Sequence, residues 1–298
     1  MTEDTANKGE RVAKVIARAG LCSRRDAERW IAERRVKVGG TVIDTPATLV
    51  SDPTAVEVDG KPLPAPAEAR LYRYHKPPGL VTTHRDEQGR ETVFDTLPPQ
   101  IGRVVSVGRL DLNSEGLLLL TNDGGLAREL ELPSNEWVRT YRVRVFGFVD
   151  DYKLTALKDG ITIEGVKYGP IDARIEKKTG RNAWLIVSLT EGKNREIRRV
   201  MEHMELQVNR LIRTHYGPFR LDILERGDVQ EIPRRQMIDQ LGGKLDSTAT
   251  SIKATKAGWA KAKAKPKAKP KSSPKSRPQS RPQPKGKAHA KGPRKPRA

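Results

Sequence analysis

The sequence has little cysteine and no long hydrophobic run. Its single cysteine, Cys22, excludes an internal disulfide and a cluster of thiolate metal ligands, and it favours a reducing compartment. The longest aliphatic run, residues 117–120, is far too short to cross a bilayer, and residues 1–7 are polar rather than signal-like. These absences predict a soluble cytoplasmic protein that does not associate with a membrane.

Apolar residues are also scarce, at 36% of 298 residues against 32% charged. The segment 247–298 contains 17 Lys and Arg and no carboxylate, which leaves 40 basic and 37 acidic residues, a net +3, for residues 1–246. Such a segment cannot bury enough apolar surface to offset its ordering entropy, so we expect a disordered basic tail. Clustered cations favour a polyanionic partner because they release counterions from phosphates.

Proline divides the remaining chain into two parts. Three prolines within residues 61–70 favour an extended backbone and oppose helix formation, so this stretch is predicted to be a linker. We therefore expect one domain in residues 1–60 and a larger one in residues 71–246.

The first domain has the pattern of two short helices followed by a hairpin. Apolar residues at helical spacing precede Gly20, the pair Ser23 and Asp26 predicts a capping box at the start of the second helix, and Gly39-Gly40 indicates a hairpin. The segment resembles the S4 domain, a small RNA-binding module. We expect the basic residues on its outward faces to contact RNA, with a merely solvated charged face as the alternative: Arg11, Lys14, Arg18, Arg24, Arg25 and Arg29.

The larger domain mixes strand and helix periodicity. Alternating residues predict strands over 141–145, 171–175, 183–189 and 219–224, and helical spacing predicts helices over 126–130, 152–157 and 197–204. The order lacks regular βαβ alternation. We therefore expect an α+β fold around a mixed, largely antiparallel sheet.

The most informative stretch is residues 104–124. A β-branched strand reaches Val107, a loop follows, an aliphatic strand occupies residues 117–121, and Asn122-Asp-Gly-Gly125 is predicted to be a turn. Asp111 therefore lies on a loop between two buried strands. Spacing alone favours a turn-forming role over a catalytic one for such an aspartate.

This stretch is similar, almost residue for residue, to the catalytic motif of the pseudouridine synthases that modify ribosomal RNA. Three more motifs of that family occur in order, His75-Lys-Pro-Pro-Gly79, Arg139-Thr-Tyr141-Arg-Val143 and the basic segment 191–200. With the S4-like module the resemblance covers most of residues 11–240. Segment 81–95 and Asn194-Arg195-Glu196 resemble the large-subunit members of the family, while Ser114-Glu115 departs from the more frequent Thr-Ser.

The resemblance implies a role for several residues. Asp111 is the implied catalytic aspartate and Arg198 its ion-pair partner, although a phosphate contact is an equal alternative for Arg198. Tyr141 is implied to stack on the target uracil, although its strand pattern alone favours a core position. Arg109 is implied to insert where the base has left, with a phosphate contact as the alternative. We expect further RNA contacts from Lys76, Lys193, Arg195 and Arg199.

Together these features predict a site-specific enzyme that isomerises uridine to pseudouridine in rRNA, with large-subunit 23S rRNA or its precursor particle as partner. The reaction needs an ionised carboxylate but no cofactor, and the histidines lack metal-ligand spacing, so no metal is expected. We also expect a monomer. The rival hypotheses are a non-catalytic RNA-binding or ribosome-assembly factor and a synthase for small-subunit rRNA. The joint presence of Asp111, Tyr141 and Arg198 favours the enzyme, because binding alone requires none of them.

Overall fold

The computed structural model describes residues 9–65 and 67–241, and the predicted basic tail at 247–298 lies outside these ranges. Among the described residues, no helix combines the length and the apolar character needed to span a membrane.

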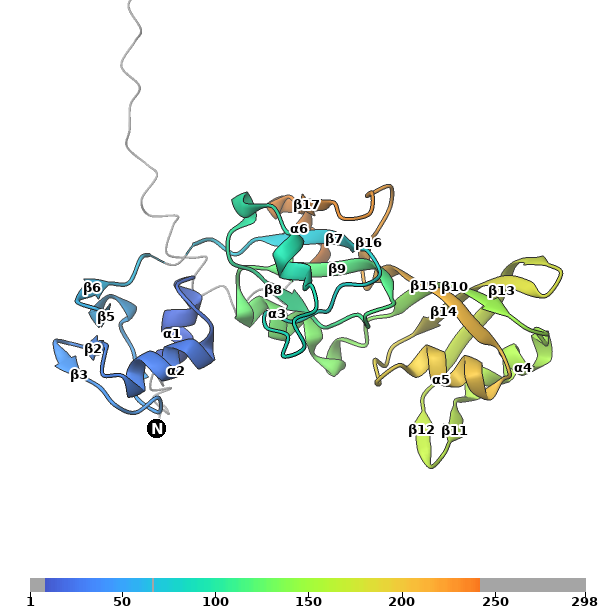
Figure 1. The fold of residues 1–298 in the computed structure, drawn as a ribbon, viewed down its shortest axis with the longest axis horizontal. Helices are drawn as coiled ribbons and strands as arrows, with labels where there is room; N and C mark the ends of the chain where they lie inside the picture. Colours follow the sequence, from blue (N-terminus) through green and yellow to red (C-terminus); the bar gives the residue numbers. More distant parts are fainter. Residues whose placement is uncertain (1–8, 66, 242–298) are drawn as a thin grey trace, which may run out of the picture. The chain divides into compact units, whose positions relative to one another are not determined.

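The N-terminal module consists of two helices and small sheets around one apolar core (Figure 1). A capping box between Ser23 and Asp26 starts the second helix, as predicted, and both Gly39 and Gly40 have the positive φ that their hairpin needs. The helices are α1 (Val12–Arg18), α2 (Arg24–Ala32) and the short 3-10 helix η1 (Pro53–Ala55). The strands form the pair β1 (Glu10–Arg11) and β4 (Leu49–Val50), and a sheet in the order β3 (Thr41–Val42), β2 (Val36–Val38), β5 (Val56–Val58) and β6 (Lys61–Pro62).

The predicted linker at 61–70 begins too early. Lys61–Pro62 pairs with β5 as the edge strand β6, and Leu63 packs against the core of the module. A proline is tolerated there because an edge strand leaves one side of its backbone unpaired.

The larger domain is built on one nine-stranded sheet, which confirms the expected α+β fold. Neighbouring strands are antiparallel except for the parallel pair β15–β9. The main path of the sheet follows the order β13 (Ile171–Thr179), β14 (Asn182–Leu189), β10 (Arg139–Phe146), β15 (Gln207–Tyr216), β9 (Glu115–Thr121), β7 (Leu71–Lys76) and β17 (Val229–Glu231). Off this path, β8 (Val105–Val107) pairs with β9 and β16 (Phe219–Arg220) pairs with β15.

Helices cover the sheet in two groups (Figure 1). Apolar residues of α4 (Asp151–Ala156) and α5 (Glu196–His203) pack into one core cluster with β10, β13 and β14. Those of α3 (Gly124–Glu131) and α6 (Arg234–Leu241) pack into a second cluster with β7 and β9. The remaining elements are the hairpin β11 (Ile161–Ile163) and β12 (Val166–Tyr168) and the 3-10 helices η2 (Val93–Thr96), η3 (Pro99–Ile101), η4 (Pro133–Asn135) and η5 (Leu157–Asp159).

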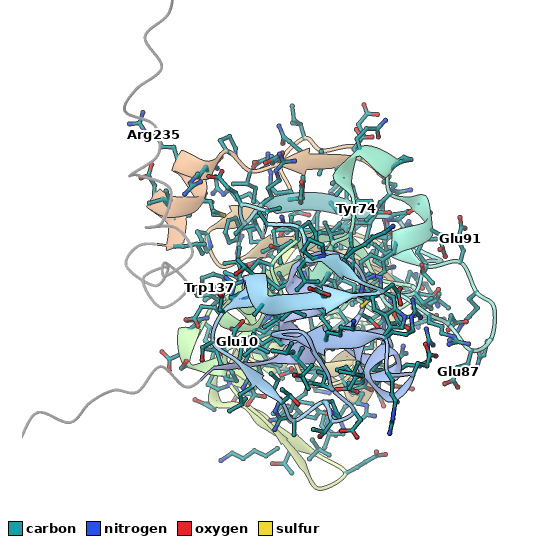
Figure 2. The ribbon with its side chains drawn as sticks, turned by 90° about the vertical axis from the view of Figure 1, so that its left-hand side faces the viewer. Glu10, Tyr74, Glu87, Glu91, Trp137 and Arg235 are labelled. Atoms are coloured by element: carbon teal, nitrogen blue, oxygen red, sulfur yellow. The ribbon has the colours of Figure 1, made fainter. Side chains whose placement is uncertain are left out.

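The segment between β7 and β8 covers the other face of β7 and β9. Its buried residues Leu80, Val93 and Val104 form a third core cluster in this domain, together with Leu110 of the loop after β8 and with Tyr74 and other residues of those strands. Figure 2 shows the loop with Glu87 and Glu91 at the margin of the molecule, whereas Tyr74 lies within it. Because β9 is covered on both faces, its aliphatic run is buried throughout rather than alternating.

Two local predictions were wrong. Gly124-Gly125 is not a turn but the start of α3, because Asp123 caps the helix by accepting hydrogen bonds from Gly125 N at 2.6 Å and Leu126 N at 3.2 Å. The strand predicted at 219–224 ends at residue 220, and the chain turns through Asp222 with φ +49°.

Candidate active site

Asp111 lies on the loop between β8 and β9, and backbone hydrogen bonds fix this loop from two sides. Ser114 N donates to Asp111 O at 3.0 Å, which closes a turn within the loop. Gly79 N donates to Leu112 O at 2.8 Å, and Thr82 Oγ1 donates to Leu110 O at 2.9 Å. The Asp111 side chain remains 31% exposed, so its carboxylate is both positioned and accessible.

Lys76 lies beneath this loop, so its predicted contact with RNA was wrong. The residue ends β7 opposite Gly116 and its side chain is fully buried. Its ammonium donates to three backbone carbonyls, those of Pro77 at 3.0 Å, Leu112 at 3.2 Å and Ser114 at 3.0 Å. Burial lowers the pKa of Lys76 to about 8, although the negative charges of Asp111 and Glu115 oppose this shift. Lys76 therefore holds the Asp111 loop and cannot reach a phosphate.

Arg198 brings a positive charge to Asp111 from α5. Its Nε lies 3.9 Å from Asp111 Oδ2, and its Nη2 donates to Asn113 O at 2.9 Å. The side chain is only 14% exposed. Burial lowers the pKa of Arg198 and the charge of Arg195 acts in the same direction, whereas Asp111 raises it. An arginine remains charged even so, which makes it a permanent counterion for the aspartate.

The start of α5 determines where Arg198 points. Arg195 has φ +51°, and Lys193 N donates to the Glu196 carboxylate at 2.9 Å, so the chain reverses and the helix begins at Glu196. Burial raises the pKa of Glu196. The Lys193 ammonium donates hydrogen bonds to Lys167 O and to the Glu191 carboxylate, so its contacts are made within the protein. Arg195 and Arg199 are exposed, so both side chains are accessible to RNA.

Tyr141 lies in β10 where two of the core clusters meet. Its half-buried ring packs against the cluster formed by α4, α5 and β10, and also against the cluster that contains Leu110. Tyr141 can therefore be part of the core, as its sequence pattern predicted, and still present an accessible ring. Tyr141 is opposite Arg213 in β15, and Arg213 is opposite Gly116 in β9. This register ties the tyrosine to the end of the Asp111 loop.

The parallel contact between β15 and β9 depends on Gly116. The residue has φ +102°, and a Cβ there would overlap the backbone carbonyl of Arg213. Arg213 is 3% exposed and donates from Nε to Leu117 O at 2.8 Å, which reinforces the same contact. Glycine is therefore required at position 116, because of the positive φ and because a Cβ would overlap the Arg213 backbone.

Sequence reasoning missed the role of Glu115. This carboxylate is 4% exposed and accepts hydrogen bonds from Arg210 Nε at 2.7 Å and Arg210 Nη2 at 2.9 Å, and Arg226 Nη2 lies 2.9 Å away. It anchors the C-terminal end of the Asp111 loop to β15 and to the segment after β16. A charged residue at the start of an entirely aliphatic strand was the available signal, because a buried carboxylate must be paired.

The basic residues proposed for RNA contact differ in how free they are. Arg109 is exposed and lies on the Asp111 loop itself. In the N-terminal module, Lys14 contacts Glu10 at 2.6 Å and Arg29 contacts Asp26 at 3.1 Å. Arg18 is partly buried, with Glu10 at 3.6 Å. The exposed members of the predicted set are Arg11, Arg24, Arg25 and Arg29. Within the described part of the chain, no group of three or more potential metal ligands comes together.

Known proteins with similar sequences identify the family. The profile of RNA pseudouridylate synthases matches residues 70–203, and the S4 domain profile matches residues 10–56. A protein of Rickettsia bellii described as an uncharacterized RNA pseudouridine synthase is 49% identical over 226 residues, which are 76% of this chain and 98% of that protein. The ribosomal large subunit pseudouridine synthase B of Pasteurella multocida is 42% identical over 262 residues, which are 84% of this chain and 75% of that protein.

A solved structure of a pseudouridylate synthase has the same fold, with a TM-score of 0.55 and 25% identity over 78% of this chain and 99% of that one. The chain belongs to the RNA pseudouridine synthase family. It is an enzyme that isomerises uridine in RNA, and it carries an S4 RNA-binding domain at its N-terminus.

Proposed function

We propose that this enzyme converts a specific uridine of large-subunit ribosomal RNA into pseudouridine, with Asp111 as the catalytic residue. The name of the Pasteurella multocida relative supports the choice of substrate, as does that of a 44% identical Yersinia pestis protein, also called ribosomal large subunit pseudouridine synthase B. The reaction breaks the bond between N1 of uracil and C1′ of ribose, joins C5 to C1′, and moves the proton of C5 to solvent while N1 gains one. Neither a redox partner nor water is consumed.

The observation that carries this proposal is the Arg198–Asp111 pair on a fixed loop. Ribose and uracil must be attacked or deprotonated by an anion, so the carboxylate has to remain ionised when RNA displaces water. The Arg198 guanidinium lies 3.9 Å away and provides a positive charge beside the carboxylate under those conditions. Because Arg198 also contacts the loop backbone, it holds the carboxylate in place as well as compensating its charge.

Tyr141 and Arg109 complete the proposed site. A uridine in folded RNA has to leave its stack before it can react, at a cost of about a few kcal/mol. The half-buried ring of Tyr141 offers a face on which the extruded uracil can stack. Arg109 is exposed on the loop that carries Asp111, and we assign to it the space that the base vacates.

The remaining basic groups position the RNA. Exposed arginines of the S4 domain, above all Arg24, Arg25 and Arg29, contact phosphates, and Arg195 and Arg199 do so near the active site. The composition of residues 247–298 supports an added affinity for RNA without any effect on which uridine is chosen. We propose a monomeric protein that acts in the cytoplasm on rRNA or on a precursor of the large subunit.

Pseudouridine mapping tests the proposal. rRNA from cells with and without the protein is compared, and the purified full-length chain is then incubated with the unmodified rRNA and with precursor particles. We expect one large-subunit position to lose pseudouridine in the deletion strain and to regain it in vitro. Loss of a small-subunit position would reject the substrate assignment. Unchanged rRNA in the deletion strain, together with inactive purified protein, would favour the assembly-factor hypothesis.

A further inference from the structure

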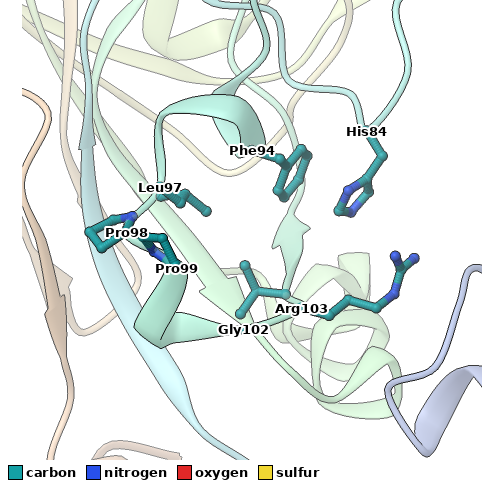
Figure 3. Close-up of a pocket in the computed structure, with 8 residues that line it drawn as sticks. His84, Phe94, Leu97, Pro98, Pro99, Gly102 and Arg103 are labelled. Carbon is teal, nitrogen blue, oxygen red and sulfur yellow. The ribbon is translucent and has the colours of Figure 1, made fainter.

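The segment between β7 and β8 forms a pocket of about 290 Å³ that the site described above does not include. Figure 3 shows His84 and Phe94 on one side and Leu97, Pro98 and Pro99 on the other, with the Arg103 guanidinium at the rim. This volume lies at the lower end of the range for ligand pockets. It is small for a peptide or for part of a protein partner, but it is sufficient for one planar ring system.

The aromatic wall of this pocket is preformed. The rings of His84 and Phe94 are stacked, with centroids 3.5 Å apart and an interplanar angle of 13°. Although the residue as a whole is exposed, partial burial of the His84 ring lowers its pKa, as does the charge of Arg103, whereas a hydrogen bond to the backbone of Val104 opposes this shift. Stacking on Phe94 fixes the plane of the His84 imidazole. Face-to-face stacking covers one face of each ring, so a further planar group can stack on the outer face of the exposed His84 ring.

We propose that this pocket binds an unpaired nucleobase of the RNA substrate, at a position other than the target uridine. The inference rests on the proposed function, because it takes rRNA as the substrate. A base would stack on the outer face of the His84–Phe94 pair, while Arg103 would contact its polar edge or the adjoining phosphate.

The pocket is coupled to the catalytic loop by direct contacts. Thr82, two residues before His84, donates from Oγ1 to the carbonyl of Leu110, the residue that precedes Asp111. Phe94 and Tyr141 pack against the same core cluster, to which Leu110 belongs. A base held in this pocket would therefore fix the RNA at a set distance from Asp111. It would help to decide which uridine reaches the carboxylate, so His84, Phe94 and Arg103 are assigned as specificity-determining residues.

Abasic substitution in the RNA, combined with His84→Ala in the protein, tests this assignment. The probe is a synthetic hairpin around the uridine mapped as described above, in which each unpaired nucleotide other than the target is replaced in turn by an abasic residue. Dissociation constants are measured with the full-length chain carrying Asp111→Asn, with and without His84→Ala. We expect one abasic position to weaken binding about tenfold with His84 present and less than twofold with alanine.

Two variants serve as controls. His84→Phe retains a stacking face and should restore both the affinity and the sensitivity to the abasic position. Arg85→Ala removes a charge from the same exposed loop without lining the pocket, so it should preserve the sensitivity that Arg103→Ala weakens. Thermal melting of each variant verifies that it is folded; His84 is exposed, so its substitution leaves the core intact.

The inference would be overturned if the effects of His84→Ala and of the abasic substitutions on binding were independent of each other. If His84→Ala weakened binding equally for every hairpin, or if no abasic position distinguished the two proteins, the pocket would hold no base. That result, with tight binding of the intact hairpin, would leave the proposed function standing. Failure of the wild-type chain to bind or modify any rRNA fragment would reject both.

Discussion

Arg198 reaches the Asp111 loop at two points, with Nε 3.9 Å from the Asp111 carboxylate and Nη2 bonded to the backbone carbonyl of Asn113 at 2.9 Å. A single guanidinium thus acts on the charge of the catalytic residue and on the conformation of the loop that carries it. Lysine has one donor group on a flexible stem and cannot reproduce this fork geometry.

Arg198→Lys is therefore expected to impair catalysis even though it keeps the charge. Displacement of a reacting group by about 1 Å can cost roughly a hundredfold in rate, and we expect a loss of at least that order in the single-turnover rate at saturating RNA. The RNA dissociation constant should change little, because the side chain is only 14% exposed. Arg199→Lys, on the exposed side of the same helix, is the matched control. A wild-type rate for Arg198→Lys would show that the two-point contact is dispensable.

Lys76 gives the stability of the fold a specific pH dependence. Its pKa is about 8 in the folded protein and 10.5 for a free lysine, so between these values the unfolded chain binds more protons. Below pH 8 the cost of burying the ammonium is fully present, and it is relieved as the pH rises toward 10.5. Relative to Lys76→Met, the wild-type free energy of unfolding should therefore increase by about 3 kcal/mol over this range.

Urea unfolding of both proteins at several pH values between 7.5 and 10.5 measures this difference. Lys177→Met, which removes an exposed lysine from β13, is the matched control for the loss of a lysine side chain. A constant difference between wild type and Lys76→Met across the range would mean that Lys76 titrates like a free lysine, and it would contradict the burial described above.

Gly116→Ala should be among the most destabilising single substitutions in the larger domain. It combines a positive φ with direct overlap of the new Cβ and the Arg213 backbone, which cannot move without breaking the β15–β9 contact. Gly89→Ala places the same residue at φ +67° in open space and should cost only about 1–2 kcal/mol for the backbone strain. Thermal unfolding compares the two, and equal shifts in Tm would refute the close approach of the strands.

The S4 domain is expected to contribute affinity rather than catalysis. Arg24 and Arg25 are exposed at the start of α2, and replacement of both with alanine should raise KM for RNA several-fold, reduce the salt dependence of binding, and leave the saturating rate within about twofold of wild type. Glu28→Ala on the same exposed helix is the control for local helix stability. A collapse of the saturating rate with unchanged RNA affinity would place the S4 domain in the active site.

Local features of the fold could be predicted from the sequence because short-range chemistry determines them. The Ser23–Asp26 capping box, the Gly39-Gly40 hairpin and the apolar stripe of α5 depend on neighbours within a few residues. The turn predicted at Gly124-Gly125 was wrong because another short-range interaction, the helix cap by Asp123, outweighs the preference of two glycines for a turn. The strand at 219–224 failed because tertiary pairing, and not alternation, sets where a strand ends.

The active site was only partly accessible to sequence reasoning. Asp111 and Arg198 are far apart in the chain, and only the family resemblance joined them, since periodicity leaves the aspartate as a turn former. The burial of Lys76 beneath the loop depends on its register opposite Gly116, which nothing local reveals. Lysine is ordinarily exposed and nothing local marks Lys76 as buried, so its predicted contact with RNA was wrong.

Asp111→Asn gives the most direct test of the central claim. Asparagine is nearly isosteric with aspartate, so the variant should fold and keep the loop contacts of Arg198 and Lys76, but it offers no anion as nucleophile or base. Single-turnover pseudouridine formation on large-subunit rRNA, measured together with RNA affinity, decides the matter. We expect product formation below detection while the RNA dissociation constant is unchanged or lower, because a negative charge near phosphates is removed. Pseudouridine formation at the wild-type rate by the folded variant would contradict the assignment of Asp111 as the catalytic residue.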